Sequence, residues 1–263
     1  MTTTRETYPA FRRTLRQLCA TLADALENVR FSDSDDAALM ALVFAAKQLD
    51  HAKALLLLGS HPDCALVCRS MLEGLVQLKW ALASPQERAR RWRVFSLVTD
   101  WRLTRQLQAE GITLDRSQVA DVEARLAQIG DELLTAKARK CRDAGTRLPD
   151  DPYIRTWHGT SLKDIFEAVR GQALYQWPYR EFAAWHHWGP DALGQALRRR
   201  GRRLHYSPQR RRYDAGVLVV AFQCVYETAQ VVDQQLALGI SDTLSRQLRS
   251  FLSMARSRAP ARR

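Results

Sequence analysis

Apolar residues recur at intervals of three and four residues along most of this 263-residue chain, and strict alternation never extends beyond about four residues. The first spacing places apolar side chains on one face of an α-helix, whereas a half-buried strand needs alternation. The chain also has only 12 Gly and 9 Pro, too few for the turns of a β-sandwich or barrel. We therefore expect an all-α fold.

Breaks in this periodicity divide the chain into predicted helices. Gly, Pro and capping residues bound them at residues 6–30, 37–58, 63–83, 86–110, 115–143, 161–171, 179–187, 191–200, 209–238 and 241–255. The two most apolar helices are joined by a short turn, which predicts an antiparallel helix hairpin at the centre of a single multi-helix bundle. The irregular residues 144–159 predict a surface loop or lid.

No linker of distinct composition divides the sequence. We expect one helical domain over residues 1–255, with its core at about 37–238, and a flexible basic tail at 256–263. The N-terminal residues MTTTRETYPAFRR contain no apolar signal segment. The longest apolar run, Ala37–Ala46, is too short to span a bilayer. These features predict a cytoplasmic protein without a membrane partner.

The net charge of +12 comes from 34 Arg and 6 Lys against 28 acidic residues. A bias toward GC-rich codons explains Arg in place of Lys but not the excess over acidic residues. Such a charge favours polyanionic partners such as nucleic acid or anionic lipid. A basic protein without such a partner is the alternative.

The five cysteines form no C-x-x-C motif. Cys64 and Cys68 lie four residues apart, on one face of a predicted helix, and no Cys or His motif accompanies them. Reduced thiols in the core explain this pattern better than zinc does. Motifs of common nucleotide-binding proteins, zinc peptidases and serine hydrolases are absent from the sequence. We expect neither a metal nor a cofactor.

Arg69 and Glu73 form the first candidate constellation, because residues four apart on a helix lie on the same face. Their neighbours are apolar, which predicts that the pair faces the interior. Burying an ion pair contributes little to stability, since desolvation offsets most of the attraction. The pair is therefore either a salt bridge that fixes the helix or part of a functional cleft.

The second constellation lies in YREFAAWHH, where Arg180 precedes His186 and His187. On a helix, residues seven apart lie on one side, about 10 Å apart along the axis. Arginine binds phosphoryl oxygens in a bidentate manner, and histidine transfers protons near neutral pH. The segment therefore suits phosphate chemistry. The alternative is a pair of structural histidines within an aromatic cluster.

The third constellation is the run from residue 198 to residue 212, where eight of fifteen residues are Arg. Like charges at this density repel one another, which favours contact with a polyanion over a solvated loop. Tyr206 adds an aromatic ring on which a base could stack. The predicted nucleic-acid-binding residues are Arg198, Arg199, Arg200, Arg202, Arg203, Tyr206, Arg210, Arg211 and Arg212.

The stretch Leu49–Trp80 resembles a family of bacterial helical proteins of unknown function. Its members share a helix, a Gly turn, an Ala-rich helix start and the motif R-S-x-x-E, here RSMLE. Their later Y-R…H segment, followed by Pro, is similar to YREFAAWHHWGP. The resemblance covers roughly residues 40–215.

The layout is also similar, more distantly, to the HEPN superfamily of helical domains, which are often dimeric. Many of them are metal-independent ribonucleases with the signature Arg, four to six residues, then His. Arg180 with His186 or His187 has that spacing, although Glu181 stands where the superfamily usually has Asn, Asp or His. The resemblance implies an HEPN-like fold and leaves a homodimer open.

Together these features favour a protein that acts on RNA rather than DNA, and that could be a metal-independent endoribonuclease of a toxin or phage-defence system. In that hypothesis His187, or its neighbour His186, moves the proton and Arg180 holds the phosphate. The arginine run binds the RNA backbone. The alternative is a non-catalytic helical protein that holds a protein or nucleic-acid partner. Whether the protein is an enzyme stays open at this point.

Overall fold

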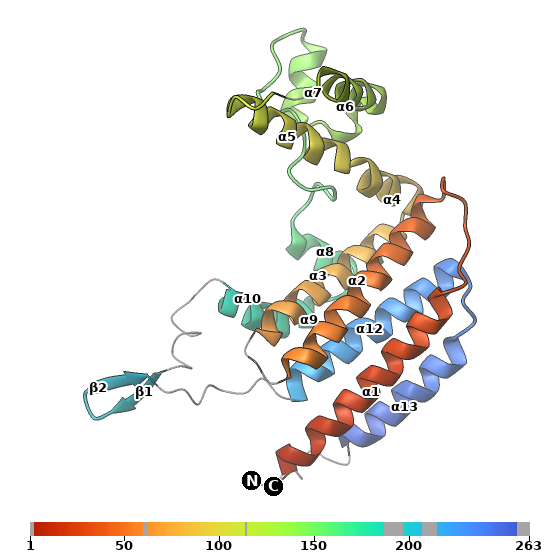
Figure 1. The fold of residues 1–263 in the computed structure, drawn as a ribbon, viewed down its shortest axis with the longest axis vertical. Coiled ribbons are helices and arrows are strands. Elements are labelled where there is room, and N and C mark those ends of the chain that lie inside the picture. Colours follow the sequence, from red (N-terminus) through yellow and green to blue (C-terminus); the bar gives the residue numbers. More distant parts are fainter. Residues whose placement is uncertain are drawn as a thin grey trace. The chain divides into compact units, whose positions relative to one another are not determined.

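The computed structural model describes residues 3–59, 61, 63–113, 115–186, 197–206 and 215–256. Over these residues the protein is all-α apart from one two-stranded β-hairpin (Figure 1). The all-α prediction is therefore confirmed. The chain forms two compact units, which are described separately below. One comprises Met1–Trp80 with Leu162–Arg263, and the other Ala81–Ser161.

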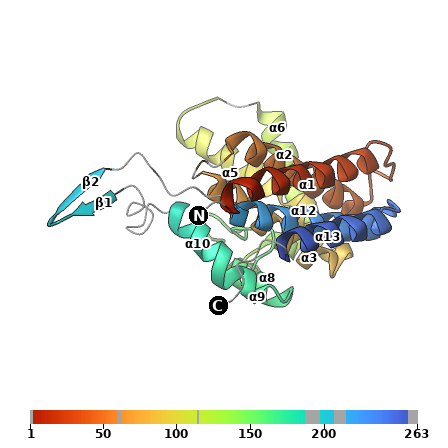
Figure 2. The ribbon, with the colours of Figure 1, turned by 90° about the horizontal axis from the view of Figure 1, so that it is seen from below.

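Helix α12 (Ala215–Leu236) is the central helix of the first unit. It packs against α1 (Thr3–Leu26), α2 (Asp36–Leu58) and α13 (Ser241–Arg256), as Figures 1 and 2 show. Its apolar side chains are buried on several sides: Val217, Leu218, Val220, Ala221, Phe222, Cys224, Val225, Ala229 and Val232. A helix that is apolar over most of its circumference needs this degree of cover.

The two apolar helices predicted at residues 37–58 and 63–83 are α2 and α3 (Cys64–Leu82). The buried Gln48 joins them, because its Nε2 donates to the Met71 carbonyl at 2.8 Å. Gly74 makes room for this contact, since a Cβ there would lie 3.3 Å from the same nitrogen. A polar bond thus fixes α3 against α2 within an otherwise apolar contact.

The second unit contains α4 (Pro85–Val94), α5 (Ser96–Ala109), α6 (Arg116–Ile129), a 3₁₀ turn (Gly130–Leu133) and α7 (Ala136–Asp143). The centre of its small core is a cluster of buried side chains: Leu97, Val98, Leu126 and Leu133. Arg102 ties the irregular segment that follows α7 to α5. Its guanidinium donates to the Asp151 carboxylate and to the carbonyls of Tyr153 and Ile154.

Two helices of this unit were predicted to be continuous, but each is interrupted in the structure. The helix expected at 86–110 is two helices that meet at Phe95, and the helix expected at 115–143 ends at Gly130. Gly130 adopts a φ of 68°, which a residue with a Cβ rarely does. Thr135 then caps α7, accepting a hydrogen bond from the Ala138 amide at 3.1 Å.

Residues 162–186 return to the first unit as α8 (Leu162–Ala168), α9 (Gln172–Leu174), a π-helical turn (Tyr175–Tyr179) and α10 (Arg180–His186). The helices expected at 161–171 and 179–187 are thus present. The π-helical turn is an addition that periodicity did not predict. Such turns are rare and occur frequently at functional sites.

The helix expected at 191–200 is wrong over its described part, because Leu197–Arg200 is strand β1, paired with β2 (Arg203–Tyr206). Gly201 and Arg202 form the two-residue turn, and Gly201 has a φ of 62°. A glycine with positive φ at the first turn position is the type II′ arrangement, whose twist matches that of an antiparallel hairpin. The short strands, four residues each, gave too little alternation to reveal the hairpin.

The described cysteines lie as thiols in or near the core. Burial raises the pKa of Cys64 to about 11 and that of Cys68 well above its usual value. Both side chains therefore stay protonated at neutral pH. Within the described ranges, no group of three or more His, Cys, Asp and Glu side chains is placed to hold a metal ion. None of the described helices combines the length and the apolar character that a membrane span requires.

Candidate functional site

The predicted pair of Arg69 and Glu73 is formed on α3. Arg69 Nε donates to Glu73 Oε1 at 3.0 Å, and the two side chains are 20% and 30% exposed. The apolar neighbours predict that the pair faces the interior. In the structure it is half-buried rather than enclosed. A pair with this exposure avoids much of the desolvation cost of a fully buried one.

Tyr179 joins this pair from the π-helical turn. Its hydroxyl donates to Glu73 Oε1 at 3.0 Å and accepts from Arg69 Nη2 at 3.4 Å. The Arg69 guanidinium carbon also lies 5.4 Å from the centre of the Tyr179 ring, within range of a cation–π contact. We call these three residues the Tyr179 cluster. It joins the R-S-x-x-E motif to the Y-R motif through the tyrosine rather than the arginine.

Two aromatic rings, those of Tyr175 and Phe166, hold Tyr179 in place. Tyr175 and Tyr179 are stacked with ring centres 5.4 Å apart, and Phe166 of α8 packs against both at 5.3 and 5.2 Å. The buried Pro178 lies within the turn between them. The wider π-helical turn changes the direction in which Tyr179 points relative to a continuous α-helix. Local structure and aromatic packing therefore both aim the hydroxyl at α3.

The electrostatics of the Tyr179 cluster favour a neutral tyrosine. Burial first, and then the charge of Glu73, raise the pKa of Tyr179. The phenol is therefore a hydrogen-bond donor rather than a nucleophile at physiological pH. Arg69 Nη1 is buried and makes no hydrogen bond with the described residues. The cluster thus fastens the turn to α3 and leaves one buried N–H donor unused.

Arg180 starts α10 immediately after this cluster, but its side chain points elsewhere. Its Nη1 donates to Gln176 Oε1 at 3.4 Å on the exposed surface. His186 is the last residue of α10, six positions later, and about 600° of helical rotation places it on a different face from Arg180. The side chain of His186 and all of His187 lie outside the described residues.

The hairpin of residues 197–206, which we call the Arg hairpin, carries the largest group of predicted contact residues. Arg199, Arg200, Arg202 and Arg203 are exposed. Within the described ranges, none of these four has an acidic partner. Their cross-strand register places Arg200 directly opposite Arg203. Like charges opposite each other destabilise a strand pair unless a counter-charge is present.

The other predicted contact residues lie partly or wholly outside the described part of the chain. Arg198 and Tyr206 lie in the strands, paired with His205 and Leu197, but their side chains are outside the described part. Arg210, Arg211 and Arg212 lie in the segment between the hairpin and α12, also outside it.

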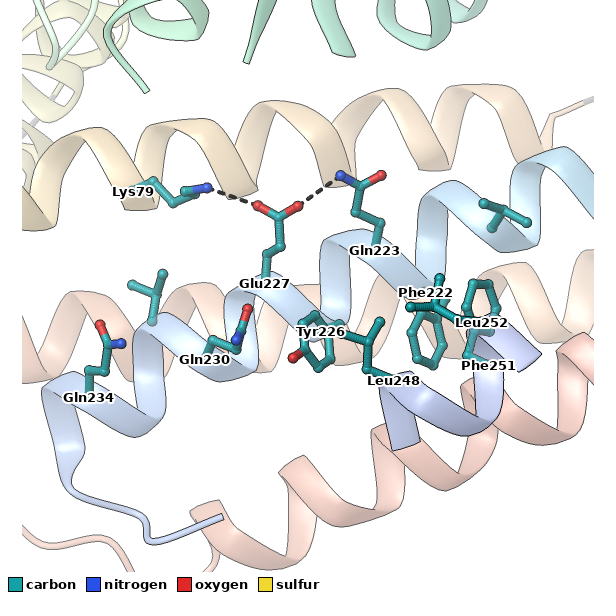
Figure 3. A pocket seen from close by; sticks show the side chains of 12 residues that line it. Lys79, Phe222, Gln223, Tyr226, Glu227, Gln230, Gln234, Leu248, Phe251 and Leu252 are labelled. Atoms are coloured by element: carbon teal, nitrogen blue, oxygen red, sulfur yellow. Dashed lines mark hydrogen bonds and ion pairs between the residues drawn. The ribbon is translucent and has the colours of Figure 1, made fainter. Parts of the chain in front are cut away.

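A groove of about 530 Å³ runs along α12 between α3 and α13 (Figure 3). One side is polar. Glu227 accepts hydrogen bonds from Lys79 Nζ and from Gln223 Nε2, each at 2.8 Å. The other side is apolar, with Leu248 and Leu252 of α13. We call it the α12 groove. Sequence reasoning missed it, because it is formed by helices far apart in the chain.

Fold and surface together define an all-α protein with an arginine-rich β-hairpin. The chain belongs to a family of unknown function, DUF5677, whose model matches residues 35–203. That range begins just before α2, includes the Tyr179 cluster and ends at the first residue of β2. A family of unknown function is what the sequence resemblance predicted. No curated protein and no solved structure matches the chain.

Proposed function

We propose that this protein binds RNA, and that the Arg hairpin is its main contact surface. The observation that supports this is the group of four exposed arginines without an acidic partner among the described residues. Several arginines elsewhere in the described chain do have one, as Arg102 has Asp151 and Arg142 has Asp131. A row of unpaired guanidinium groups suits a chain of phosphates.

The whole-chain charge supports the same partner. The net charge of +12 attracts any polyanion over a distance, and the hairpin concentrates part of it at one place. RNA is preferred to DNA here because of the resemblance to HEPN domains. The similarity in layout also underlies the proposed HEPN-like relationship.

Fluorescence anisotropy with a short RNA tests the proposal. Replacing Arg199, Arg200, Arg202 and Arg203 with Ala is expected to weaken binding by at least a hundredfold, because several phosphate contacts are lost. Arg125→Ala with Arg147→Ala is the control outside the hairpin, since these two arginines are exposed but paired with Asp121 and Asp150. Equal loss in both variants would assign the binding to overall charge and not to the hairpin.

Cleavage of the bound RNA is the further activity that we propose, as a metal-independent endoribonuclease of a toxin or phage-defence system. Three features support it. Arg180 is exposed and has no acidic partner among the described residues. The Tyr179 cluster fixes the residue before it, and Trp177 of the same turn is 65% exposed, available for a base to stack on.

The chemistry needs one proton acceptor and one cation. His187, or His186, takes the proton of the 2′-hydroxyl, O2′ attacks the adjacent phosphorus, and the bond from phosphorus to the 5′-oxygen breaks as that oxygen takes a proton from water. Arg180 neutralises the phosphoryl oxygens during the step. The products are a 2′,3′-cyclic phosphate and a 5′-hydroxyl. Incubation of RNA with the protein in EDTA is expected to give these ends.

Single replacements separate the roles in cleavage. His187→Ala is expected to abolish cleavage while RNA binding persists, and Arg180→Ala to lower its rate strongly. Cleavage that persists in both His186→Ala and His187→Ala would remove both histidines from the mechanism. In that case the alternative function becomes the better account.

The alternative is a non-catalytic helical interaction protein, and the α12 groove is the observation that favours it. Its lining is self-complementary, with one cation, one anion and several glutamine amides that both donate and accept. A second copy of this chain is the partner that such a surface fits, giving a homodimer. Sedimentation equilibrium of the wild type and of Leu248→Glu tests it. A monomeric wild type would contradict the homodimer.

A further inference from the structure

The two faces of the Arg hairpin differ in chemistry. Because side chains alternate along a strand and paired residues share a face, the register places Arg200, Arg203 and His205 on one face. Leu197, Arg199 and Leu204 lie on the other. One face is therefore wholly basic in its described side chains, and the other is mainly apolar.

The apolar face is open to solvent. Leu197 is 40% exposed and Leu204 is 65% exposed. Leu204 lies directly opposite Arg199, and Leu197 precedes Arg199 by two residues on the same face. Two exposed leucines are unexpected on a surface that only binds phosphates. Exposed apolar area lowers solubility and contributes nothing to phosphate binding, so it indicates a second kind of contact.

A duplex would not use this apolar face. A-form RNA presents phosphates and ribose hydroxyls on its outside, and its major groove is too deep and narrow for side chains to read. Contact with a duplex would employ the arginines and leave both leucines in water. A single strand differs, because its unstacked bases offer apolar faces within a few ångströms of its phosphates.

We propose that the Arg hairpin selects single-stranded RNA, with phosphates against Arg200 and Arg203 and unpaired bases against Leu197 and Leu204. This inference rests on the proposed RNA binding and specifies its substrate class. Arg199 lies among the leucines, where its guanidinium can stack on a base or bind a phosphate. In this arrangement the RNA strand contacts both faces of the Arg hairpin rather than one.

Two variants of the same hairpin, matched in chemistry, test the inference. Leu197→Thr with Leu204→Thr changes the apolar face, and Arg200→Thr with Arg203→Thr changes the basic face. Threonine keeps a high β propensity, so both variants retain a hairpin-forming sequence. The probes are an unstructured RNA oligonucleotide, the duplex formed with its complement, and vesicles that contain phosphatidylserine.

The wild type is expected to bind the single strand about tenfold more tightly than the duplex, which corresponds to burial of roughly one leucine side chain. The apolar-face variant should lose that preference and keep its duplex affinity. The basic-face variant should bind both RNA forms more weakly by a similar factor, with its preference retained.

Other results overturn the inference in distinguishable ways. Equal wild-type affinity for strand and duplex, or an unchanged preference in the apolar-face variant, would refute single-strand selection while RNA binding stands. No binding of either RNA form would refute the proposed function itself. Vesicle binding that the apolar-face variant loses, without any effect on RNA, would assign the leucines to a lipid surface.

Discussion

Ala237 has the left-handed backbone conformation that favours glycine. It follows the last residue of α12 with a φ of 52°, and the next amide, that of Leu238, donates to the Asp233 carbonyl at 3.3 Å. This is the geometry of a helix end that usually carries Gly. A residue with a Cβ pays about 1–2 kcal/mol in this region.

Ala237→Gly is therefore expected to stabilise the protein. The gain is about 0.5–1 kcal/mol in the free energy of unfolding, after allowance for the greater entropy of the unfolded chain. Urea unfolding measures it. Ala20→Gly, at an exposed position inside α1, is the control and should instead cost about 1 kcal/mol. Equal losses at both positions would contradict the proposed strain at Ala237.

His158 makes the stability of the second unit depend on pH. Its Nδ1 lies 2.8 Å from the Thr160 carbonyl, and burial lowers its pKa below the usual 6.5. The unfolded chain therefore binds the proton more readily than the folded chain. The free energy of unfolding should fall as the pH drops below about 6.5 and through the lower pKa of the folded state.

His158→Asn tests this dependence, because the asparagine amide can donate to the same carbonyl without titrating. The variant is expected to lose less stability than the wild type between neutral and mildly acidic pH, as measured by thermal unfolding. His51, whose pKa burial also lowers, is present in both proteins and cancels in the comparison. Identical pH profiles would show that His158 contributes nothing.

At the scale of elements, the Tyr179 cluster fastens the π-helical turn to α3. Glu73→Ala would strand the half-buried Arg69 and remove the acceptor of Tyr179. The expected cost is about 1–3 kcal/mol, between the values for exposed and buried pairs, because the pair retains some contact with water. Urea unfolding of the variant gives this number.

The control for this prediction is Glu167→Ala. Glu167 pairs with Lys163 at the same four-residue spacing, but both side chains are more than half exposed. Its loss should cost no more than about 0.5 kcal/mol. A similar small cost for Glu73→Ala would mean that Tyr179 and Arg69 remain satisfied without the carboxylate, against the geometry described above.

Helices whose ends are marked by local sequence signals could be predicted, and elements without such signals could not. The apolar helices α2 and α3 were predicted almost residue by residue, because their periodicity and flanking Gly and Asp are local signals. The break at Gly130 was missed since a single glycine is also tolerated within a helix. The Arg hairpin was missed because arginine is a good helix former, and the only signal for the hairpin was one Gly at its turn.

At the scale of the whole molecule, the parts of the candidate sites that depend on local spacing were predictable from sequence, and the parts that depend on tertiary packing were not. Arg69 and Glu73 could be paired from their spacing alone, since a helix brings residues four apart together. Their third member, Tyr179, lies 106 residues further along, and only tertiary packing reveals it. The α12 groove likewise requires three helices in their folded positions. The arginine run was visible in the sequence, but its two-faced presentation on a hairpin was not.

The central claim is that RNA binds through the Arg hairpin, and the salt dependence of RNA affinity tests it most directly. Each phosphate contact with a single strand contributes about 0.7 to the slope of log K against log salt concentration. Replacing the four described hairpin arginines with Ala is expected to reduce the slope by about three. An unchanged slope in this variant would contradict the claim, since the hairpin would then hold no phosphate.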